Sequence, residues 1–381
     1  MKTEILSGRM AETCLYVLAD PHYLSPSLFQ RGSASFQLML ERNDAKMMED
    51  MPSVLELFVH RALRDRPDAV LCPGDLTMNG EYVSLMEMKA ALERIRDAGI
   101  AVLVLPGNHD IAFPYAMDVS QDVPVRTGNV SQQLFLKEMG CFGYEQALFQ
   151  AEDSFSYAFA LKKDLWLIGL DSNTEKKPGE FTEDTLAWLK TVISAARESG
   201  VSLISMTHQN LLKQSRLFQK GFVADNADAA LSILKPAVFL NLSGHSHLQH
   251  CAREDGFVDL CSESAAVWPL GFSRILLKDN TIRHERERTS FSQKSAKERI
   301  DTWLEIQLNR ELSRLVDDPL KKEAMIRFGT ELGRDYYADC LDESRKYTEE
   351  AAWSFWQEVK GKSFWEIYLE EIVRPGKQDS A

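Results

Sequence analysis

Histidine, aspartate and asparagine residues are concentrated in five short motifs along the 381-residue sequence. The motifs are, in order, Asp20-Pro21-His22, Gly74-Asp75, Gly107-Asn108-His109-Asp110, Thr207-His208 and Gly244-His245-Ser246-His247. Carboxylate and amide oxygens suit hard divalent ions, and imidazole suits Zn, Mn or Fe. A mixed set without thiolates therefore favours hard or borderline metals over structural zinc. The motifs predict a hydrolytic site that holds two metal ions.

Asp75 is a lone carboxylate with ligand-rich motifs on both sides of it in the sequence. Two catalytic ions about 3.5–4 Å apart share a ligand, and Asp75 is the natural bridge. Asp, Asn and Gly after a strand are also ordinary turn residues. Five of the eight histidines fall inside the motifs, however, which turn chemistry does not explain. The remaining three, His60, His250 and His284, are predicted to lie outside the site.

Each motif follows a short apolar run, so each is predicted to stand at the carboxyl end of a β-strand. Open α/β sheets bind ligands at that end. The runs are residues 15–19, 69–71, 101–105, 201–206 and 238–242. Further runs at 155–160, 165–170, 257–261 and 272–277 predict additional strands.

Helical signals alternate with these strands. Residues 81–99 carry apolar side chains at helical spacing and end in Gly99, directly before a strand run. Residues 182–200 repeat this arrangement, with Thr182 as the predicted N-cap and Gly200 at the carboxyl end. This alternation predicts a layered arrangement of strands and helices through the first three quarters of the chain.

The sequence changes character near residue 292. Apolar residues recur every three or four positions from Ile300 to Leu315, and the chain to Ile372 shows no convincing strand. We therefore predict a catalytic domain at 1–291 and a helical carboxy-terminal module at 292–381, with a frayed tail at 375–381. The module contains four of the seven tryptophans, Trp303, Trp353, Trp356 and Trp365. Its apolar face is expected to dock onto the catalytic domain, and homodimerisation through it is the alternative.

The series D-x-H, G-D, G-N-H-D, H and G-H-x-H resembles that of the calcineurin-like metallophosphoesterase superfamily, over about residues 12 to 285. The resemblance implies an α/β fold (α+β by some schemes), a four-layer β-sandwich flanked by helices. It implies a first metal held by Asp20, His22, Asp75 and His247. It implies a second metal held by Asp75, Asn108, His208 and His245. The ions could be Mn, Fe, Zn or Mg, with Mn or Fe favoured.

The resemblance also leaves His109 unligated beside the substrate, with Asp110 as the carboxylate that orients its imidazole. Two metal ions lower the pKa of a water molecule, bind phosphoryl oxygens and stabilise an in-line displacement. His109 is expected to assist the leaving group, a role typically worth about 10²–10⁴-fold. Both residues are therefore predicted to be catalytic.

Composition limits the substrates and the location. A formal net charge of −13 disfavours extended nucleic acid, whose binding depends on Lys and Arg. Two divalent ions against two carboxylates would still leave a local charge of about +2 for a small phosphate ester. The six cysteines are scattered and predict buried free thiols in a reducing compartment. Since no signal peptide or membrane-spanning run is evident, we expect a cytoplasmic protein without membrane contact.

The similarity is to the bacterial cyclic-nucleotide phosphodiesterase-like branch with a helical extension, so a phosphodiester substrate is favoured. The loops at 111–153 and 210–225 are predicted to shape the pocket, with Tyr115, Arg126, Lys213, Arg216 and Lys220 as candidate contacts or merely solvated side chains. A phosphomonoesterase or nucleotide pyrophosphatase would use the same ions. The alternative of another class is a non-catalytic scaffold of the same fold, against which the complete motif set argues.

Overall fold

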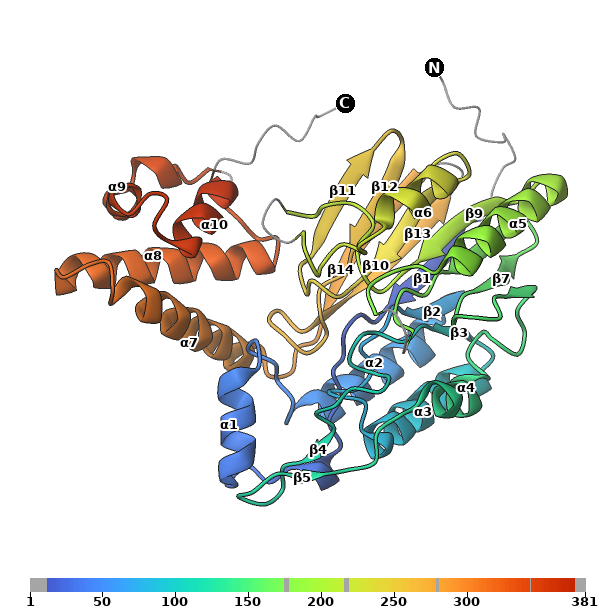
Figure 1. Ribbon diagram of the computed structural model, residues 1–381, viewed down its shortest axis with the longest axis horizontal. Coiled ribbons are helices and arrows are strands. Elements are labelled where there is room, and N and C mark those ends of the chain that lie inside the picture. The colour runs from blue at the N-terminus through green and yellow to red at the C-terminus, as the bar shows by residue number, and fades with distance from the viewer. Residues whose placement is uncertain (1–11, 175–177, 216–218, 279–280, 343, 374–381) are drawn as a thin grey trace.

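Two β-sheets face each other at the centre of the computed structural model, which describes residues 12–174, 178–215, 219–278, 281–342 and 344–373 (Figure 1). The first sheet has the order β14-β13-β1-β2-β3. Its strands are β1 (Thr13–Val17), β2 (Ala69–Cys72), β3 (Ala101–Val104), β13 (Gly271–Lys278) and β14 (Thr281–Arg288). β1, β2 and β3 run parallel, whereas β13 and β14 are antiparallel to their neighbours.

The second sheet has the order β11-β12-β10-β9-β8-β7-β6. Its strands are β6 (Phe149–Gln150), β7 (Tyr157–Lys162), β8 (Leu165–Gly169), β9 (Ser202–Met206), β10 (Val238–Ser243), β11 (His250–Glu254) and β12 (Phe257–Cys261). The four strands β8, β9, β10 and β12 are parallel. A separate two-stranded hairpin joins β4 (Met117–Asp118) to β5 (Val125–Arg126).

Helices cover the outer faces of both sheets. The first sheet is covered by α2 (Met51–Asp65) and α3 (Tyr82–Asp97), with α4 (Gln132–Met139) beside α3, and the second by α5 (Glu183–Ser199) and α6 (Ala227–Leu234) (Figure 1). Neighbouring residues of β9 show the layering, because Ile204 belongs to the core between the sheets and Leu203 packs with α5 and α6. Successive side chains of a strand point to opposite faces. The α/β sandwich predicted from the sequence is confirmed.

The helix ends follow the chemistry of their terminal residues. The Thr182 hydroxyl caps α5 by accepting the Thr185 amide at 3.0 Å, and Gly200 ends that helix with φ +67. Glycine adopts this left-handed conformation without the steric cost of a Cβ. The helices and strands predicted around 81–105 and 182–206 are therefore present with boundaries that differ by one or two residues.

Among the described residues after Ser292, all the regular elements are helices or helical turns. They are α7 (Gln293–Leu312), α8 (Pro319–Tyr337), the 3-10 turn η2 (Tyr347–Glu349), α9 (Ala351–Glu358) and α10 (Phe364–Val373). We call these elements the helical module. Its core buries Trp353 and Trp356, while Trp303 and Trp365 are half-buried. The predicted tail at 375–381 lies outside the described residues.

The helical module docks onto the catalytic part. Its core includes Ala45 and Val267 from the catalytic part, and Arg299 of α7 binds Glu49 with one contact of 2.8 Å. The ring of Tyr336 in α8 packs edge-on against His250 at a centroid distance of 4.6 Å. Docking is thus confirmed, whereas dimerisation and the boundary between 291 and 292 stay predictions.

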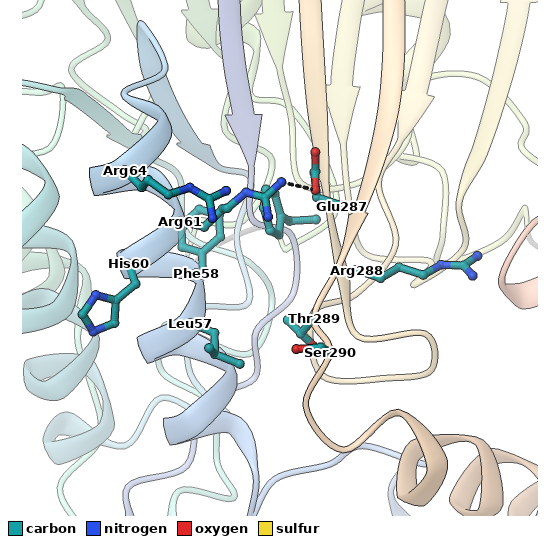
Figure 2. Close-up of a pocket in the computed structure, with 10 residues that line it drawn as sticks. Leu57, Phe58, His60, Arg61, Arg64, Glu287, Arg288, Thr289 and Ser290 are labelled. Carbon is teal, nitrogen blue, oxygen red and sulfur yellow. Dashed lines mark hydrogen bonds and ion pairs between the residues drawn. The ribbon is translucent and has the colours of Figure 1, made fainter.

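An ion pair joins α2 to β14 on the side of the first sheet (Figure 2). The Arg61 guanidinium binds Glu287 at 2.7 Å and Asp65 at 2.6 Å, above a groove of about 510 Å³ between the two elements. Arg64 also binds Asp65. Because Asp65 and Glu287 already bind the guanidiniums of Arg61 and Arg64, we assign these residues a role in packing α2 against β14.

Some sequence expectations differ from the structure. Only Cys72 and Cys261 are fully buried, and Cys251 and Cys340 are exposed, although all six cysteines are free. The segment 111–153 was expected to be one long connection, but it contains β4, β5, α4 and β6. Its short strands carry too few apolar residues to show a pattern. No helix within the described ranges is long and apolar enough to cross a membrane.

Candidate dinuclear metal site

The five motifs meet at one edge of the sandwich. β1, β2 and β3 are neighbours in the first sheet, and β9 and β10 are neighbours in the second. Parallel neighbours place their carboxyl ends at the same edge. The first sheet therefore presents Asp20, His22, Asp75 and Asn108–His109, and the second presents His208, His245 and His247. The seven predicted metal-ligating residues are brought together from positions more than 200 apart in sequence.

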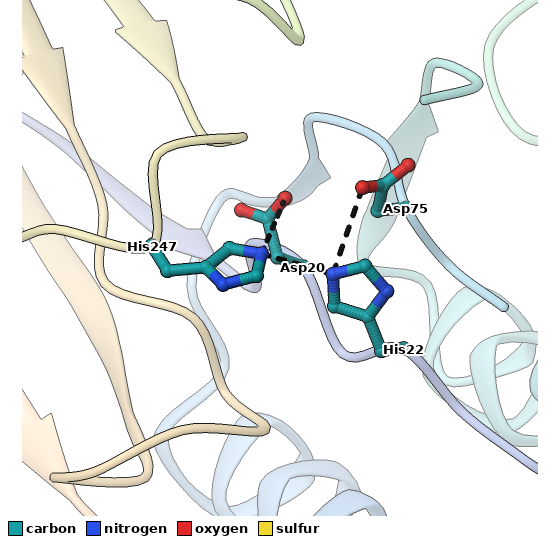
Figure 3. A group of neighbouring side chains, drawn as sticks. All are labelled: Asp20, His22, Asp75 and His247. Carbon is teal, nitrogen blue, oxygen red and sulfur yellow. Dashed lines mark hydrogen bonds and ion pairs between the residues drawn. The ribbon is translucent and has the colours of Figure 1, made fainter. Parts of the chain in front are cut away.

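The first cluster consists of Asp20, His22, Asp75 and His247, all buried (Figure 3). One ligand atom from each lies within 4.8 Å of the others. The Nε2 atoms of His22 and His247 are 2.9 Å apart. His22 Nε2 is 3.6 Å from Asp75 Oδ2, and His247 Nε2 is 3.9 Å from Asp20 Oδ1. This is the group of side chains predicted for the first metal.

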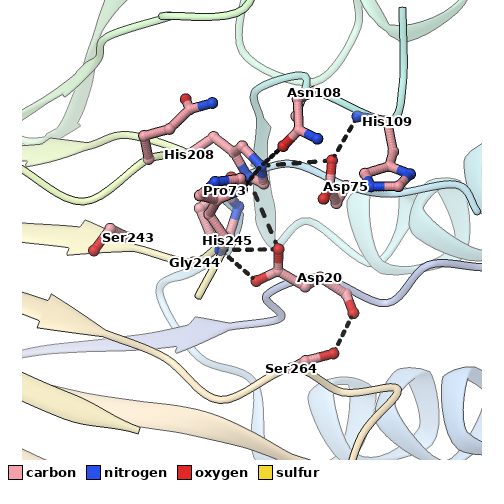
Figure 4. Close-up of polar contacts among 12 residues, drawn as sticks. Asp20, Pro73, Asp75, Asn108, His109, His208, Ser243, Gly244, His245 and Ser264 are labelled. Atoms are coloured by element: carbon pink, nitrogen blue, oxygen red, sulfur yellow. Dashed lines mark hydrogen bonds and ion pairs between the residues drawn. The ribbon is translucent and has the colours of Figure 1, made fainter. Parts of the chain in front are cut away.

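The second cluster consists of Asp75, His208 and His245, with Asn108 beside them (Figure 4). His208 Nε2 is 3.1 Å from His245 Nδ1, 2.9 Å from Asn108 Oδ1 and 3.5 Å from Asp75 Oδ1. Asp75 thus belongs to both clusters, one carboxylate oxygen facing each. Its position matches the predicted bridge.

The hydrogen bonds of the second cluster show that it suits a cation. His208 Nδ1 lies 2.8 Å from the Pro73 carbonyl and His245 Nε2 lies 2.6 Å from the Gly221 carbonyl, so each of these nitrogens donates its proton there. In neutral imidazole the other nitrogen then carries a lone pair. The two lone pairs face each other and the Asp75 carboxylate with no proton between them. A metal ion would satisfy these acceptors, and carbonyl partners of this kind orient metal-ligating histidines.

Burial keeps the imidazoles in the form that binds metal. It lowers the pKa of His22 and His247 well below the ordinary value and lowers the pKa of His245 to about 4. Metal-ligating histidines must be neutral. Burial and the nearby charge of Asp75 raise the pKa of Asp20. A bound cation would favour the ionised form of this carboxylate.

The backbone is strained at this edge. Five predicted ligands have a positive backbone angle φ, which is 47° at Asp20, 41° at His22, 49° at Asp75, 67° at His245 and 59° at His247. This conformation costs roughly 1–3 kcal/mol for each non-glycine residue and clusters at functional sites. Gly107 and Gly244 allow the close approach, because a Cβ there would stand 2.1 Å from Asp75 Oδ1 and 2.4 Å from Asp20 Oδ2. The packing of the whole edge therefore holds these side chains in place.

His109 lies next to both clusters without belonging to either. Its amide donates to Asp75 Oδ1 at 2.9 Å, and its ring meets His22 edge-on at 5.0 Å. Nδ1 is 2.8 Å from the Met78 carbonyl, so this nitrogen carries the proton, and no hydrogen bond to Nε2 is found among the described residues. The ring stacks on Phe113 at 4.5 Å. Sequence reasoning missed both contacts, since a backbone carbonyl carries no residue signal and Phe113 is one apolar residue in a loop.

The orienting role predicted for Asp110 is corrected by its contacts. Its buried carboxylate accepts the amides of Leu76, Thr77 and Gly107 at 2.8 to 3.0 Å and the Thr77 hydroxyl at 2.8 Å. Among the hydrogen bonds of the described residues, none joins it to the His109 ring, which Met78 orients instead. Asp110 therefore ties together the loops after β2 and β3.

The other predicted residues lie away from the clusters or remain unassigned. His60 pairs with Glu56 at 2.9 Å, and His284 contacts Ser273 at 3.0 Å, as expected for residues outside the site. His250 contacts the Gln214 carbonyl. Arg126 is exposed on β5, while Lys213 and Lys220 line a groove together with residues of α6 and β11. Their substrate contacts stay predictions, and Arg216 lies outside the described residues.

Comparison with known proteins identifies the family of this chain. The family model described as calcineurin-like phosphoesterase matches residues 15–249, which span all five motifs. The chain belongs to the calcineurin-like phosphoesterase family. A dimetal phosphatase from Danio rerio has a similar structure, with a TM-score of 0.50, 14% identity, and coverage of 73% of this chain and 99% of that chain. At this identity the likeness shows the fold of the family alone.

Two further relatives are more distant or partial. The Plasmodium protein GAP50, the anchor in the inner membrane complex, gives a TM-score of 0.45 at 12% identity, over 74% of this chain and 86% of that one. The DNA double-strand break repair protein Mre11 from Aeropyrum pernix is 45% identical over 65 residues. That match spans 16% of this chain and 16% of the length of Mre11. It is thus a short shared segment within this calcineurin-like phosphoesterase.

Proposed function

We propose that this protein is a phosphodiesterase that uses two divalent metal ions, with Mn or Fe favoured. Its substrates would be small phosphodiesters, with cyclic nucleotides first among them. The observation that carries the proposal is the pair of Asp/His clusters that share Asp75. His109 lies beside them and belongs to neither cluster. Membership of the calcineurin-like phosphoesterase family supports phosphoester hydrolysis.

The residues divide into three roles. Asp20, His22 and His247 would hold one ion, Asn108, His208 and His245 the other, and Asp75 both. Bound there, the two ions supply Lewis acidity toward phosphoryl oxygens and lower the pKa of a water molecule. The Pro73 and Gly221 carbonyls hold His208 and His245 in the tautomer that points a lone pair inward.

His109 would act on the leaving group. Met78 holds the proton on Nδ1, so a protonated ring presents Nε2–H to the site as a donor. An imidazolium there can transfer a proton to the departing oxygen or donate a hydrogen bond to it. Asp110 would contribute by fixing the two loops that carry Asp75 and His109.

Aromatic side chains beside His109 favour a nucleoside-containing substrate. The Phe113 ring stacks on His109, and Tyr115, with 62% of its surface exposed, lies 5.7 Å from Phe113. Such rings provide stacking surfaces for bases, about 1–3 kcal/mol per base. The net charge of −13 supports a small substrate over an extended nucleic acid.

The decisive experiment compares substrates with metal-depleted protein resupplied with Mn²⁺. The substrates are bis(p-nitrophenyl) phosphate, p-nitrophenyl phosphate, and 2′,3′- and 3′,5′-cyclic nucleotides. Asp75→Ala removes the shared carboxylate and should abolish turnover, whereas His60→Ala changes an exposed histidine and serves as the matched control. Diester turnover that Asp75→Ala loses and His60→Ala keeps would support the proposal.

Other outcomes favour the alternatives. A preference for p-nitrophenyl phosphate would favour a phosphomonoesterase, which would use the same site, and a nucleoside diphosphate ester would test a nucleotide pyrophosphatase. Absent turnover on all of these substrates would count against the proposal and for a non-catalytic scaffold, whereas metal-independent turnover would count against the proposal alone.

A further inference from the structure

A buried pair of amide side chains lies beside the second cluster. Asn173 and Gln209 are each only 3% exposed. Gln209 Nε2 donates to Asn173 Oδ1 at 2.8 Å, and Asn173 Nδ2 donates back to Gln209 Oε1 at 2.9 Å. Burying an amide is costly unless its hydrogen bonds are made, and two apolar side chains would fill the same space without that requirement. The pair therefore calls for a reason beyond filling the core.

The turn after β8 carries Asn173 to the edge of the sandwich where the clusters lie. β8 is the neighbour of β9 in the second sheet and runs parallel to it, so this turn reaches the same edge as His208, which follows β9. The buried carboxylate of Asp171 holds the turn by accepting the Asn173 amide at 2.7 Å and the Phe155 amide at 3.1 Å. The backbone of Asn173 is thus tied to the sheet that carries His208.

The amide pair connects the two loops that carry Asn108 and His208. Gln209 directly follows His208 in the sequence. Asn173 Nδ2 also donates to the carbonyl of Pro106, two residues before Asn108, in a long hydrogen bond of 3.4 Å. Pro106 follows β3 of the first sheet, whereas Asn173 and Gln209 follow strands of the second. The pair therefore links the two sheets next to the second cluster.

Further hydrogen bonds hold the pair in one arrangement. The Ser172 hydroxyl also donates to Gln209 Oε1, so this oxygen accepts two hydrogen bonds. Asn173 Nδ2 uses both of its protons, one on Gln209 and one on Pro106. Hydrogen bonds depend on direction as well as distance, and a buried network whose partners are in place makes its members rigid. The position of Gln209 relative to Pro106 is thus fixed more sharply than apolar contacts would fix it.

We propose that Asn173 and Gln209 are positioning residues, whose amide pair sets the separation of Asn108 and His208 and so supports binding of the second metal ion. This proposal rests on the two-ion site of the proposed function. His208 Nε2 is 2.9 Å from Asn108 Oδ1 (Figure 4). Removal of groups that orient metal ligands typically weakens metal binding by about 10- to 100-fold. The unshared ligands of the first ion lie on the loops after β1 and β10, so the first ion should not depend on the pair.

The test titrates metal-depleted protein with Mn²⁺. Calorimetry gives the affinity for each ion, and electron paramagnetic resonance distinguishes one bound Mn²⁺ from a coupled pair. Gln209→Met keeps most of the volume and removes the amide. It should bind the first ion as the wild type does and the second about 10- to 100-fold more weakly, and Asn173→Leu should behave in the same way. Turnover of both variants should recover as the Mn²⁺ concentration is raised, because the defect lies in metal affinity.

Two further variants separate positioning from general stability. The Asn226 amide binds the backbone of Phe181 at 2.8 and 2.9 Å and contacts neither of the two loops, so Asn226→Leu is the matched control and should keep both ions. Asn173→Gln combined with Gln209→Asn exchanges the lengths of the two side chains and keeps both amides. This exchange should recover part of the affinity for the second ion.

Two results would overturn the proposal. One is wild-type affinity for both ions in Gln209→Met and Asn173→Leu, and the other is an equal loss of both ions. If the single variants fail to fold, Asn173→Leu combined with Gln209→Met decides the question, because this double variant leaves neither amide without its partner. It should keep the first ion and bind the second weakly, and wild-type affinity for both would overturn the proposal.

Failure of the proposed function would look different. A wild-type protein that binds two Mn²⁺ ions and hydrolyses none of the phosphate esters would overturn that function. The Mn²⁺ titrations of the variants would still decide whether the amide pair supports the second ion. A wild-type protein that binds fewer than two ions would overturn both.

Discussion

At the scale of single residues, three histidines of the motifs each donate one ring proton to a backbone carbonyl, but they differ in what the rest of the ring contacts. His208 and His245 each give a proton to a backbone carbonyl and turn a lone pair toward the shared Asp75 cluster. His109 also gives its Nδ1 proton to a carbonyl, that of Met78, but its ring stacks on Phe113 and lies in neither cluster. Under the proposed function, the carbonyl contact leaves the first two histidines ready to bind metal and the third ready to contact substrate.

This division predicts the behaviour of His109→Ala. The variant should keep the metal content of the wild type, because the ring is in neither cluster. It should lower kcat by about 10²–10⁴-fold, and most for alkoxide leaving groups, which need protonation more than p-nitrophenolate does. Metal analysis and rates on a series of diesters with leaving groups of rising pKa provide the measurement. Full activity, or loss of an ion, would contradict the assigned role.

At the scale of elements, the site depends on how closely the loops after β1, β2, β3, β9 and β10 approach one another. Gly107 follows β3, and Asp75 follows β2. The Gly107 amide binds Asp110, while its Cα hydrogen occupies the space beside Asp75 that a side chain would take. Close approach of two loops therefore sets the position of the shared carboxylate.

Gly107→Ala should disturb this approach. The new Cβ would stand 2.1 Å from Asp75 Oδ1 and 2.3 Å from the Asp75 amide, so the two loops must separate. We expect a folded protein by circular dichroism that binds less than its full complement of Mn²⁺ and loses at least 10²-fold in turnover. Gly128→Ala, which has open space around the added Cβ, is the control. Normal metal content in Gly107→Ala would show that the loops can adapt.

The elements also show which parts of the fold could be predicted from the sequence. Apolar runs and helix caps predicted β1, β2, β3, β9, β10 and α5, because buried strands and capped helices leave local patterns. β11 left no such pattern, since Ala252 is its one buried residue. The motifs predicted which ligand-type side chains meet. The contact between the Met78 carbonyl and His109 depends on long-range packing, which no local pattern encodes.

At the scale of the whole molecule, the helical module and the sandwich share buried surface near the site. Ala45 and Val267 of the catalytic part lie in the core of the module, and Ser215, seven residues after His208, contacts Glu371 of α10 at 3.0 Å. Three large apolar side chains of the module are exposed, those of Ile306, Phe364 and Ile367. These residues are the natural place to seek the predicted homodimer, which sedimentation of the wild-type protein would reveal.

Glu263 makes this junction sensitive to pH. The residue follows β12 and is buried, and neither carboxylate oxygen has a hydrogen-bond partner among the described residues. Burial raises the pKa of Glu263 to about 7. The negative charge of Asp339, beyond α8, also raises this pKa, whereas the positive charges of Arg286 and Arg288 on β14 lower it. Between about pH 4.5 and 7 the folded protein keeps a proton that the unfolded chain releases. The free energy of unfolding should therefore fall as pH rises through this range.

Glu263→Gln removes this proton and tests its contribution. Relative to wild type, the variant should gain about 3 kcal/mol in free energy of unfolding between pH 4.5 and pH 8, the equivalent of the shift in pKa. Urea unfolding of both proteins at the same metal content, at several pH values, measures the difference. Glu305→Gln changes an exposed carboxylate of α7 and should show no such trend. A difference that does not change with pH would mean that the pKa of Glu263 is the same in the folded and the unfolded protein, which would contradict the prediction. A difference that moves in favour of the wild type as pH rises would mean that Arg286 and Arg288 hold the carboxylate in its ionised form in the folded protein.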